Sequence, residues 1–195
     1  MNFLRKLFNI NKESSNDKLV KKQPVNLSLD DSFVHYFINK GGKFLYSTKI
    51  EEVVHNLNHI IVENGWNEIS CNDIDLLKLT TTIPVTIKEK LNNTTPIFTS
   101  CEHLIANSGE ILFSSNQIGS QKLASLSNDF IVYATTSQLV KNIGEGLTGI
   151  KMNFKGNIPT NISSIKNYSI SETNDNILEF NQNSKNLYLL LFEDL

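Results

Sequence analysis

Residues 99 to 115 carry the side chains and turn groups of this chain that could bind or transform a ligand. The stretch reads Thr-Ser-Cys-Glu-His-Leu-Ile-Ala-Asn-Ser-Gly-Glu-Ile-Leu-Phe-Ser-Ser. A short apolar signal at residues 104–106 favours a helix, residues 107–109 favour a polar turn, and residues 111–113 favour a strand that ends in two serines. Turns between rigid elements place backbone N–H groups and short side chains where α/β proteins bind ligands. We therefore expect a binding site in this stretch.

The turn itself offers two consecutive amides, those of Ser108 and Gly109. Concave amide pairs of this kind bind carboxylate or phosphate oxygens without a charged side chain. Alternatively, Gly109 only supplies the left-handed conformation that ends a helix. His103 also has two interpretations, a hydrogen-bond donor to an anionic ligand or a structural residue of the helix. The sequence leaves both choices open.

Other patterns that carry chemistry are weak. His55 and His59 have the spacing of a helical metal-ligand pair. The glutamates around them indicate a solvated helix face instead. No phosphate loop, Gly-x-Ser-x-Gly elbow or dinucleotide-binding glycine motif follows a predicted strand, since the glycines at 144, 146 and 149 are expected to end a helix. We expect neither a metal nor a cofactor.

Composition limits the partners and the compartment. The chain has 195 residues and a net charge of −2, and its lysines are scattered, so nucleic acid is not an expected partner. Cys71 and Cys101 stand far apart, outside any Cys-x-x-Cys pattern, which supports neither a disulfide framework nor a cysteine-ligated cluster or zinc site. No apolar run approaches the roughly 20 residues that span a bilayer, and no signal-peptide core is evident. We expect a cytoplasmic protein.

The chain divides into a tail and one domain. Residues 1–28 are predicted to be an amphipathic N-terminal segment and a flexible tether, and residues 29–195 a single α/β domain. Residues 1–10 place apolar side chains on one helical face, opposite Arg5 and Lys6. This segment predicts either a weak membrane or partner contact or a frayed terminus. The apolar residues are Phe3, Leu4, Leu7 and Phe8.

Helices and strands are expected to alternate along the domain. Helices are predicted over residues 30–40 with Asp30 or Asp31 as the cap, over 50–64, over 74–79 and over 135–143. Strands are predicted over 43–47, 66–71, 96–99, 130–134 and 187–192. This alternation predicts a mostly parallel sheet with helices on both faces and right-handed connections. The carboxyl ends of such strands meet at one edge, where we expect the site.

Residues 99–115 resemble the signature of the LUD domain, found in LutC-like bacterial lactate-utilisation proteins. The matching residues are Thr99, Glu102, Ile105, Ala106, Ser108 and Gly109. Residues 171–175, Ser-Glu-Thr-Asn-Asp, resemble the first half of a second family signature, and residues 186–191 resemble the closing strand of the family. Asn107 stands where the family has an acidic residue. A carboxylate role at that position would therefore pass to Glu110 or Glu102.

The resemblance implies a three-layer α/β/α sandwich, similar to the fold of sugar-phosphate isomerases and CoA transferases. It also implies an accessory subunit of L-lactate or related organic-acid utilisation, with iron–sulfur partner proteins that carry the electrons. The two isolated cysteines agree with electron transfer by partner proteins, because this chain cannot ligate a cluster by itself.

One pocket at the carboxyl ends of the strands is expected to bind a small anionic metabolite, a carboxylate or a phosphate. For this to hold, Ser108 and Thr173 must share a common cleft. The candidate catalytic carboxylates are Glu110, Glu102 and Asp175. The candidate ligand-binding residues are Thr99, Asn107, Ser108, Gly109, Ser114, Ser115, Ser171, Thr173 and Asp175.

Two alternatives of different classes remain. In the first alternative the chain is an enzyme in its own right, an acyl or CoA transferase or a hydrolase, and uses Glu110 or Glu102 as nucleophile or base. In the second it is a non-catalytic interaction module. Ligand binding separates them, because a true ligand raises the melting temperature by mass action.

Overall fold

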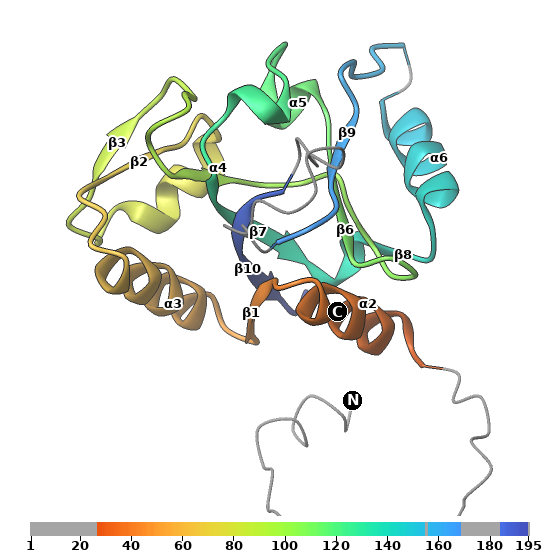
Figure 1. The fold of residues 1–195 in the computed structure, drawn as a ribbon, viewed down its shortest axis with the longest axis horizontal. Coiled ribbons are helices and arrows are strands. Elements are labelled where there is room, and N and C mark those ends of the chain that lie inside the picture. The colour runs from red at the N-terminus through yellow and green to blue at the C-terminus, as the bar shows by residue number, and fades with distance from the viewer. Residues whose placement is uncertain (1–26, 155, 169–183, 195) are drawn as a thin grey trace, which may run out of the picture.

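A parallel sheet of six strands forms the centre of the molecule (Figure 1). The computed structural model describes residues 27–154, 156–168 and 184–194. In spatial order the strands are β1 (Lys43–Ser47), β10 (Asn186–Phe192), β7 (Asp129–Thr135), β4 (Ile97–Thr99), β2 (Glu68–Ser70) and β3 (Thr86–Lys88). The predicted α/β class and the mostly parallel sheet are confirmed.

The two long central strands are apolar on both faces. In β10, Leu187 and Leu189 belong to one buried cluster, and Tyr188 and Leu190 belong to another. Strand β7 divides in the same way, with Phe130 in the first cluster and Ile131 in the second. Because successive side chains of a strand point to opposite faces, both faces of this sheet must be covered.

Helix α3 (Ile50–Glu63) covers one face of the sheet. Its apolar residues recur every three or four positions, so they form one stripe that packs on β1 and β10. The stripe comprises Val53, Leu57, Ile60 and Ile61. The short helices α4 (Ile74–Leu77) and η1 (Lys78–Thr80) extend this cover beside β2. The helix predicted over residues 50–64 is confirmed.

The other face is covered by α2 (Leu29–Asn39) and by a second sheet. The order of this sheet is β8 (Leu139–Val140), β5 (His103–Ile105), β6 (Glu110–Phe113) and β9 (Ser163–Ile165). Helix α6 (Ile143–Asn153) packs on its outer side through Ile150 (Figure 1). Helix α2 is capped by Ser28, whose Oγ accepts from the amide of Asp31 at 3.4 Å, and the predicted acidic caps are wrong.

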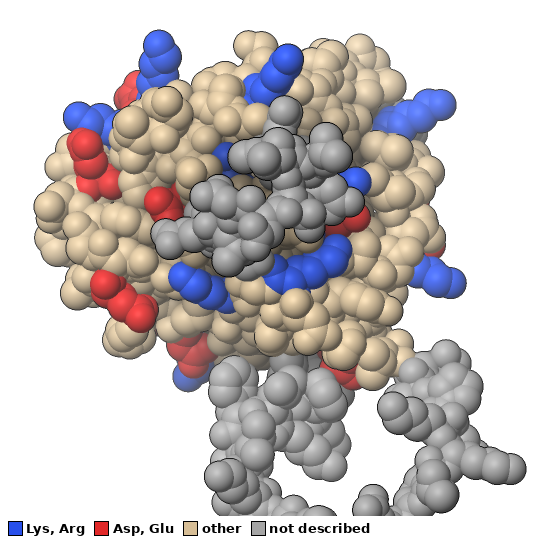
Figure 2. All heavy atoms as spheres, in the orientation of Figure 1, with Lys and Arg blue, Asp and Glu red and all other residues tan. Residues whose placement is uncertain are grey.

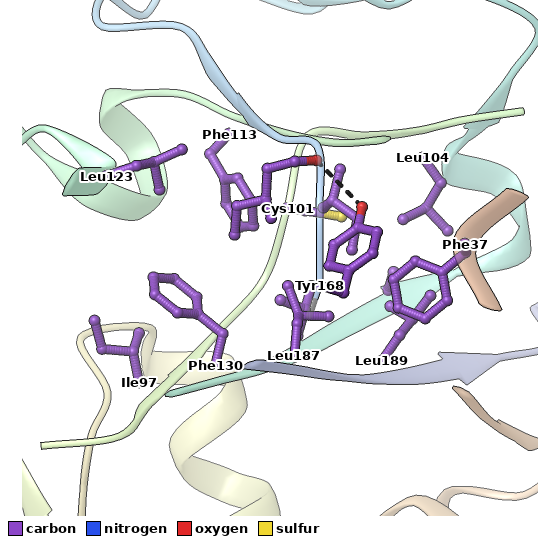
Figure 3. Packing of buried hydrophobic residues seen from close by; sticks show 14 of the residues in the cluster. Phe37, Ile97, Cys101, Leu104, Phe113, Leu123, Phe130, Tyr168, Leu187 and Leu189 are labelled. Carbon is purple, nitrogen blue, oxygen red and sulfur yellow. Dashed lines mark hydrogen bonds between the residues drawn. The ribbon is translucent and has the colours of Figure 1, made fainter. Parts of the chain in front are cut away.

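Aromatic side chains fill the space between α2 and the two sheets. Phe37 of α2 and Tyr168 lie side by side, with ring centres 4.4 Å apart (Figure 3). The Tyr168 hydroxyl donates to the carbonyl oxygens of Gly109 at 2.5 Å and Ile165 at 3.2 Å. Burial raises the pKa of this hydroxyl well above its usual value, and the Glu110 charge adds to the shift. Tyr168 therefore stays a neutral donor that ties the second sheet to the core.

Residues 104–106 do not form the predicted helix. Leu104 and Ile105 lie in strand β5, which pairs antiparallel with β6 through a turn at residues 107–109. Gly109 takes the left-handed conformation in this turn, with φ of 66°. Three apolar residues fit a strand as well as a helix, and the hairpin with β6 and the long-range pairing with β8 decide between them.

The helix predicted over residues 135–143 is also wrong. The chain forms a single turn, η3 (Thr136–Gln138), then β8, and α6 begins at Ile143 after the cap Asn142. The glycines expected to break the pattern lie inside α6. A Cβ atom on Gly149 would lie 2.8 Å from His103 Nε2, so the missing side chain lets the helix approach the second sheet.

Two further short helices, α5 (Ser115–Ile118) and η2 (Leu123–Ser125), connect β6 to β7. On the face shown in Figure 2, basic and acidic side chains both lie scattered over a mostly uncharged surface. Within the described ranges, no helix has the length and the apolar character needed to cross a bilayer.

Candidate ligand-binding site

Glu102, which follows β4, has one anchored and one open carboxylate oxygen. Its Oε1 accepts hydrogen bonds from Ser114 Oγ at 2.5 Å and from Asn116 Nδ2 at 2.9 Å. Its Oε2 has no hydrogen bond to any described residue, and the side chain is half-buried. A carboxylate that is fixed through one oxygen can present the other to a ligand hydroxyl or to a proton.

Helix α5 supplies the groups that hold Glu102. Ser114 caps this helix: its Oγ accepts from the amide of Asn116 at 3.1 Å, and its own amide donates to Gln117 Oε1 at 2.9 Å. Such a capping box satisfies the free amides of the first turn. Ser114 is completely buried, so it orients Glu102 and does not face a ligand. The side-chain nitrogen of Gln117 makes no hydrogen bond within the described residues, and its Oε1 lies 3.4 Å from Ser114 Oγ.

The neighbouring carboxylate, Asp73 after β2, accepts hydrogen bonds from the protein at both of its oxygens. Its Oδ1 accepts from the amides of Asp75 at 3.0 Å and Leu76 at 3.3 Å, at the start of α4. Its Oδ2 accepts from Ser100 Oγ at 2.8 Å. Asp73 therefore joins the ends of β2 and β4, and Glu102 is the carboxylate left with an open oxygen.

The predicted turn lies at the other end of the β5–β6 hairpin. The amides of Ser108 and Gly109 both donate to the Ile105 carbonyl, at 3.3 and 2.8 Å, and the Asn107 amide donates to the Lys141 carbonyl at 3.1 Å. These bonds close the hairpin, and the Gly109 amide donates within the turn instead of facing a ligand. Binding of an anion by these amides stays a prediction that requires the turn to rearrange.

The remaining predicted residues are spread over both ends of the hairpin. Glu110 lies at the turn end, where it accepts from Ser164 Oγ at 2.8 Å. Thr99 is buried and donates to the Ser100 carbonyl at 3.2 Å, and Ser115 Oγ accepts from the Thr160 amide at 3.0 Å. The structure thus brings Glu102 and Ser114 together and separates them from residues 107–110.

The second half of the predicted pocket lies outside the described residues. Ser171, Thr173 and Asp175 all belong to this part. The common cleft of Ser108 and Thr173 therefore stays a prediction.

Sequence reasoning missed Asn116 and Gln117, although a signal was present. Ser114, followed three residues later by Gln117, has the spacing of a capping box. That spacing indicates a helix start directly after β6, and with it two side-chain amides near the serine.

The histidines do not form a metal site. His103 Nδ1 lies 3.3 Å from the Gln138 carbonyl oxygen, and its ring packs under α6, which fits the structural interpretation. His55 and His59 are exposed on α3, and His59 lies 3.7 Å from Glu63. No group of three metal-ligating side chains occurs among the described residues.

Both cysteines are buried and weakly acidic. Burial raises the pKa of Cys71 to about 11, although a hydrogen bond to the Asp73 backbone opposes the shift. Burial also raises the pKa of Cys101, and the charge of Glu102 adds to it. Because the thiolate is the nucleophile, both buried thiols are expected to react slowly at neutral pH.

An open depression of about 500 Å³ lies at the edge of the sheet beside β3. Lys88 is paired with Glu68 there, at 3.3 Å. The lining contains none of the predicted site residues, and it consists of Ile87, Lys88, Glu89, Lys90, Asn92 and Thr95. We regard Glu102 as the better candidate, because its oriented carboxylate provides specific chemistry that this shallow surface lacks.

The fold and the elements around Glu102 are those of a known α/β family. The sequence model of the LUD domain matches residues 31–192, and the chain belongs to this family. The resemblance described from the sequence is thereby confirmed. Membership supports, in general terms, a role related to lactate utilisation.

A solved structure supports the fold independently. A DUF162 family protein from Deinococcus radiodurans is similar with a TM-score of 0.56 and 14% sequence identity, over 86% of this chain and 99% of that chain. At this identity the similarity concerns the fold alone. A comparison with curated proteins gave no match.

Proposed function

We propose that this protein is a LutC-like accessory subunit in the utilisation of L-lactate or a related organic acid, and that it binds the small anionic metabolite beside Glu102. The observation that carries the proposal is the carboxylate with one oxygen held by two donors and the other open. Family membership supplies the metabolic context.

The groups around Glu102 suit a 2-hydroxy acid. Glu102 Oε2 would accept the hydrogen of the 2-hydroxyl group, and the side-chain amides of Asn116 and Gln117 would donate to the carboxylate of the ligand. Neutral donors hold an anion without the strength of an arginine or a lysine. Because Glu102 is also negative, we expect weak binding, with a Kd on the order of 1 mM.

Electron transfer would belong to iron–sulfur partner proteins. The sequence has two cysteines, both buried, and a cluster requires several thiolates. Free buried thiols also fit a reducing cytoplasm, which we propose as the compartment.

Calorimetry with L-lactate, pyruvate and acetate tests the proposal. We expect L-lactate to bind more tightly than acetate, which lacks the hydroxyl group. Glu102→Gln should reduce the preference for L-lactate over acetate, because an amide oxygen is a weaker acceptor for the 2-hydroxyl group, whereas loss of the Glu102 charge affects both acids alike. Glu110→Gln is the matched control at the other end of the hairpin and should bind normally. An unchanged ratio of L-lactate to acetate affinity in Glu102→Gln would refute the role of Glu102, and no binding of any of the three acids would favour the interaction module.

A second function uses the same carboxylate. The open oxygen of Glu102 also suits nucleophilic attack on an acyl-CoA, as in the acyl or CoA transferase alternative. Attack would form a mixed anhydride between Glu102 and the acetyl group and release CoA as the thiolate, so release of free CoA from acetyl-CoA tests it. Equal CoA release by the wild type and Glu102→Gln would rule this reaction out for acetyl-CoA.

A further inference from the structure

The two residues that follow β10 connect the carboxyl ends of neighbouring strands. The Glu193 amide donates to the Ser47 carbonyl at 2.9 Å, and the Glu193 carboxylate accepts a hydrogen bond from the Tyr46 hydroxyl, both at the end of β1. Asp194 turns to the other side and binds the residues that follow β7.

Asp194 holds the single turn η3 with both of its oxygens. Oδ1 accepts from Thr136 Oγ1 at 2.8 Å and from the Ser137 amide at 3.0 Å, and Oδ2 accepts from Ser137 Oγ at 2.6 Å. Slight burial opposes ionisation, but the hydrogen bonds outweigh it and lower the pKa of Asp194 to about 2. The carboxylate is therefore charged throughout the neutral range, and its hydrogen bonds are of the strong, charge-assisted kind.

Gln138, the last residue of η3, carries the connection on to Glu102. Its Nε2 donates to the carbonyl oxygens of Cys101 at 2.5 Å and Glu102 at 3.3 Å, and its Oε1 accepts from the Thr135 amide at 2.8 Å. The Gln138 carbonyl oxygen lies 3.3 Å from His103 Nδ1. One side chain thus links the end of β7 to the segment between β4 and β5.

This segment depends on Gln138 because the sheets do not hold it fully. Ser100, Cys101 and Glu102 lie after the end of β4 and before the start of β5. The Glu102 amide donates to the Leu112 carbonyl at 2.8 Å, whereas the carbonyls of Cys101 and Glu102 bind Gln138. The direction of the Glu102 side chain is therefore set from two sides, by Gln138 at the backbone and by Ser114 and Asn116 at the carboxylate.

We propose that Asp194 is a positioning residue that holds η3 and, through Gln138, fixes the backbone from which Glu102 presents its open oxygen. This inference rests on the proposed function only where it concerns ligand binding. Asp194 itself does not touch the ligand. Without its carboxylate, η3 loses the acceptor for three donors, which loosens the turn that positions Gln138, although the bond from the Thr135 amide to Gln138 Oε1 remains. A displacement of about 1 Å at a binding or reacting group is enough to lower the affinity or the rate by a large factor.

The variant Asp194→Asn tests the connection, and Asp129→Asn is the matched control. Asp129 begins β7 at the opposite edge of the same sheet, where it accepts from Asn186 Nδ2 at 2.7 Å. We expect faster amide hydrogen exchange at residues 136–138 and at Glu102 and His103 in Asp194→Asn, but not in Asp129→Asn. We also expect the Kd for L-lactate to rise about tenfold in Asp194→Asn alone.

A double-mutant cycle with Gln138→Leu separates positioning from general stability. If Asp194 acts through Gln138, the losses of L-lactate affinity in Asp194→Asn and Gln138→Leu will not add. Unchanged exchange at Glu102 and His103 in Asp194→Asn, or additive losses, would overturn the proposal. The exchange measurement needs no ligand, so a failure of L-lactate to bind refutes the proposed function and leaves the test of Asp194 intact.

Discussion

Gly109 allows the β5–β6 hairpin to lie directly against α2, and its replacement by alanine tests this contact. A Cβ atom at this position would lie 2.5 Å from the Phe37 amide nitrogen and 2.7 Å from the Tyr36 carbonyl carbon. Both are backbone atoms of α2, so they cannot turn away as the end of a flexible side chain can. Gly65, at the end of α3, is the matched control: its φ of 65° is almost the same, but no atom lies within 4 Å of its Cβ position.

The two variants separate backbone strain from crowding. Alanine in the left-handed region costs roughly 1–2 kcal/mol, and both variants carry this cost. Forcing extra atoms into a well-packed region costs a further 1–3 kcal/mol or so, and only Gly109→Ala carries that cost. We therefore expect Gly109→Ala to lose about 2–5 kcal/mol of unfolding free energy and Gly65→Ala about 1–2 kcal/mol.

Urea unfolding followed by circular dichroism measures the difference. With about 2–4 °C of melting temperature per kcal/mol for a chain of this size, thermal melts should also rank the two variants clearly. Equal losses in the two variants would refute the reasoning, because they would show that the hairpin does not press on α2. A larger loss for Gly65→Ala would refute it as well.

Two further predictions concern buried groups. Tyr168→Phe should lose about 1–3 kcal/mol of unfolding free energy in urea, because the Gly109 carbonyl loses its buried donor, whereas the exposed Tyr36→Phe should change it by less than about 0.5 kcal/mol. Cys71 and Cys101 should react with a thiol reagent at neutral pH only as fast as the protein opens, because both are buried and protonated. Rapid labelling of the native protein would contradict this.

The parts of the fold that the sequence predicts are those with a long, regular pattern. Helix α3 shows the apolar repeat of an amphipathic helix over 14 residues, and β10 is a continuous apolar run that only a buried central strand accommodates. In both cases the local pattern and the tertiary packing demand the same structure, so the prediction holds.

Of the second sheet only the strand over residues 111–113 was predicted, because its strands have two to four residues. Such short runs have no period of their own, and pairing across distant parts of the chain decides their structure. The glycines of α6 misled for a related reason. Their helix cost, about 1 kcal/mol each relative to alanine, is overridden by close packing, as Gly149 on His103 illustrates.

The same error explains why only some of the predicted site residues lie together in the structure. Three residues span about 4.5 Å as a helix but about 10 Å as a strand. Because residues 103–105 form a strand, the turn at 107–109 lies a full strand length from Glu102. Residue types therefore pointed to Glu102 and Ser114, whereas the grouping of residues depended on an element that the sequence leaves ambiguous.

The position of β10 in the centre of the sheet has a consequence for the order of folding on the ribosome. Strand β10 lies between β1 and β7, and among the described strands it alone pairs with β1. Lys43 of β1 pairs with Tyr188, far along the chain. During synthesis, β1, α2 and α3 thus emerge long before β10, and until then the edge of β1 that pairs with β10 has no neighbouring strand. Such a high contact order predicts slow, late closure of the sheet and a long period in which chaperones can bind the growing chain.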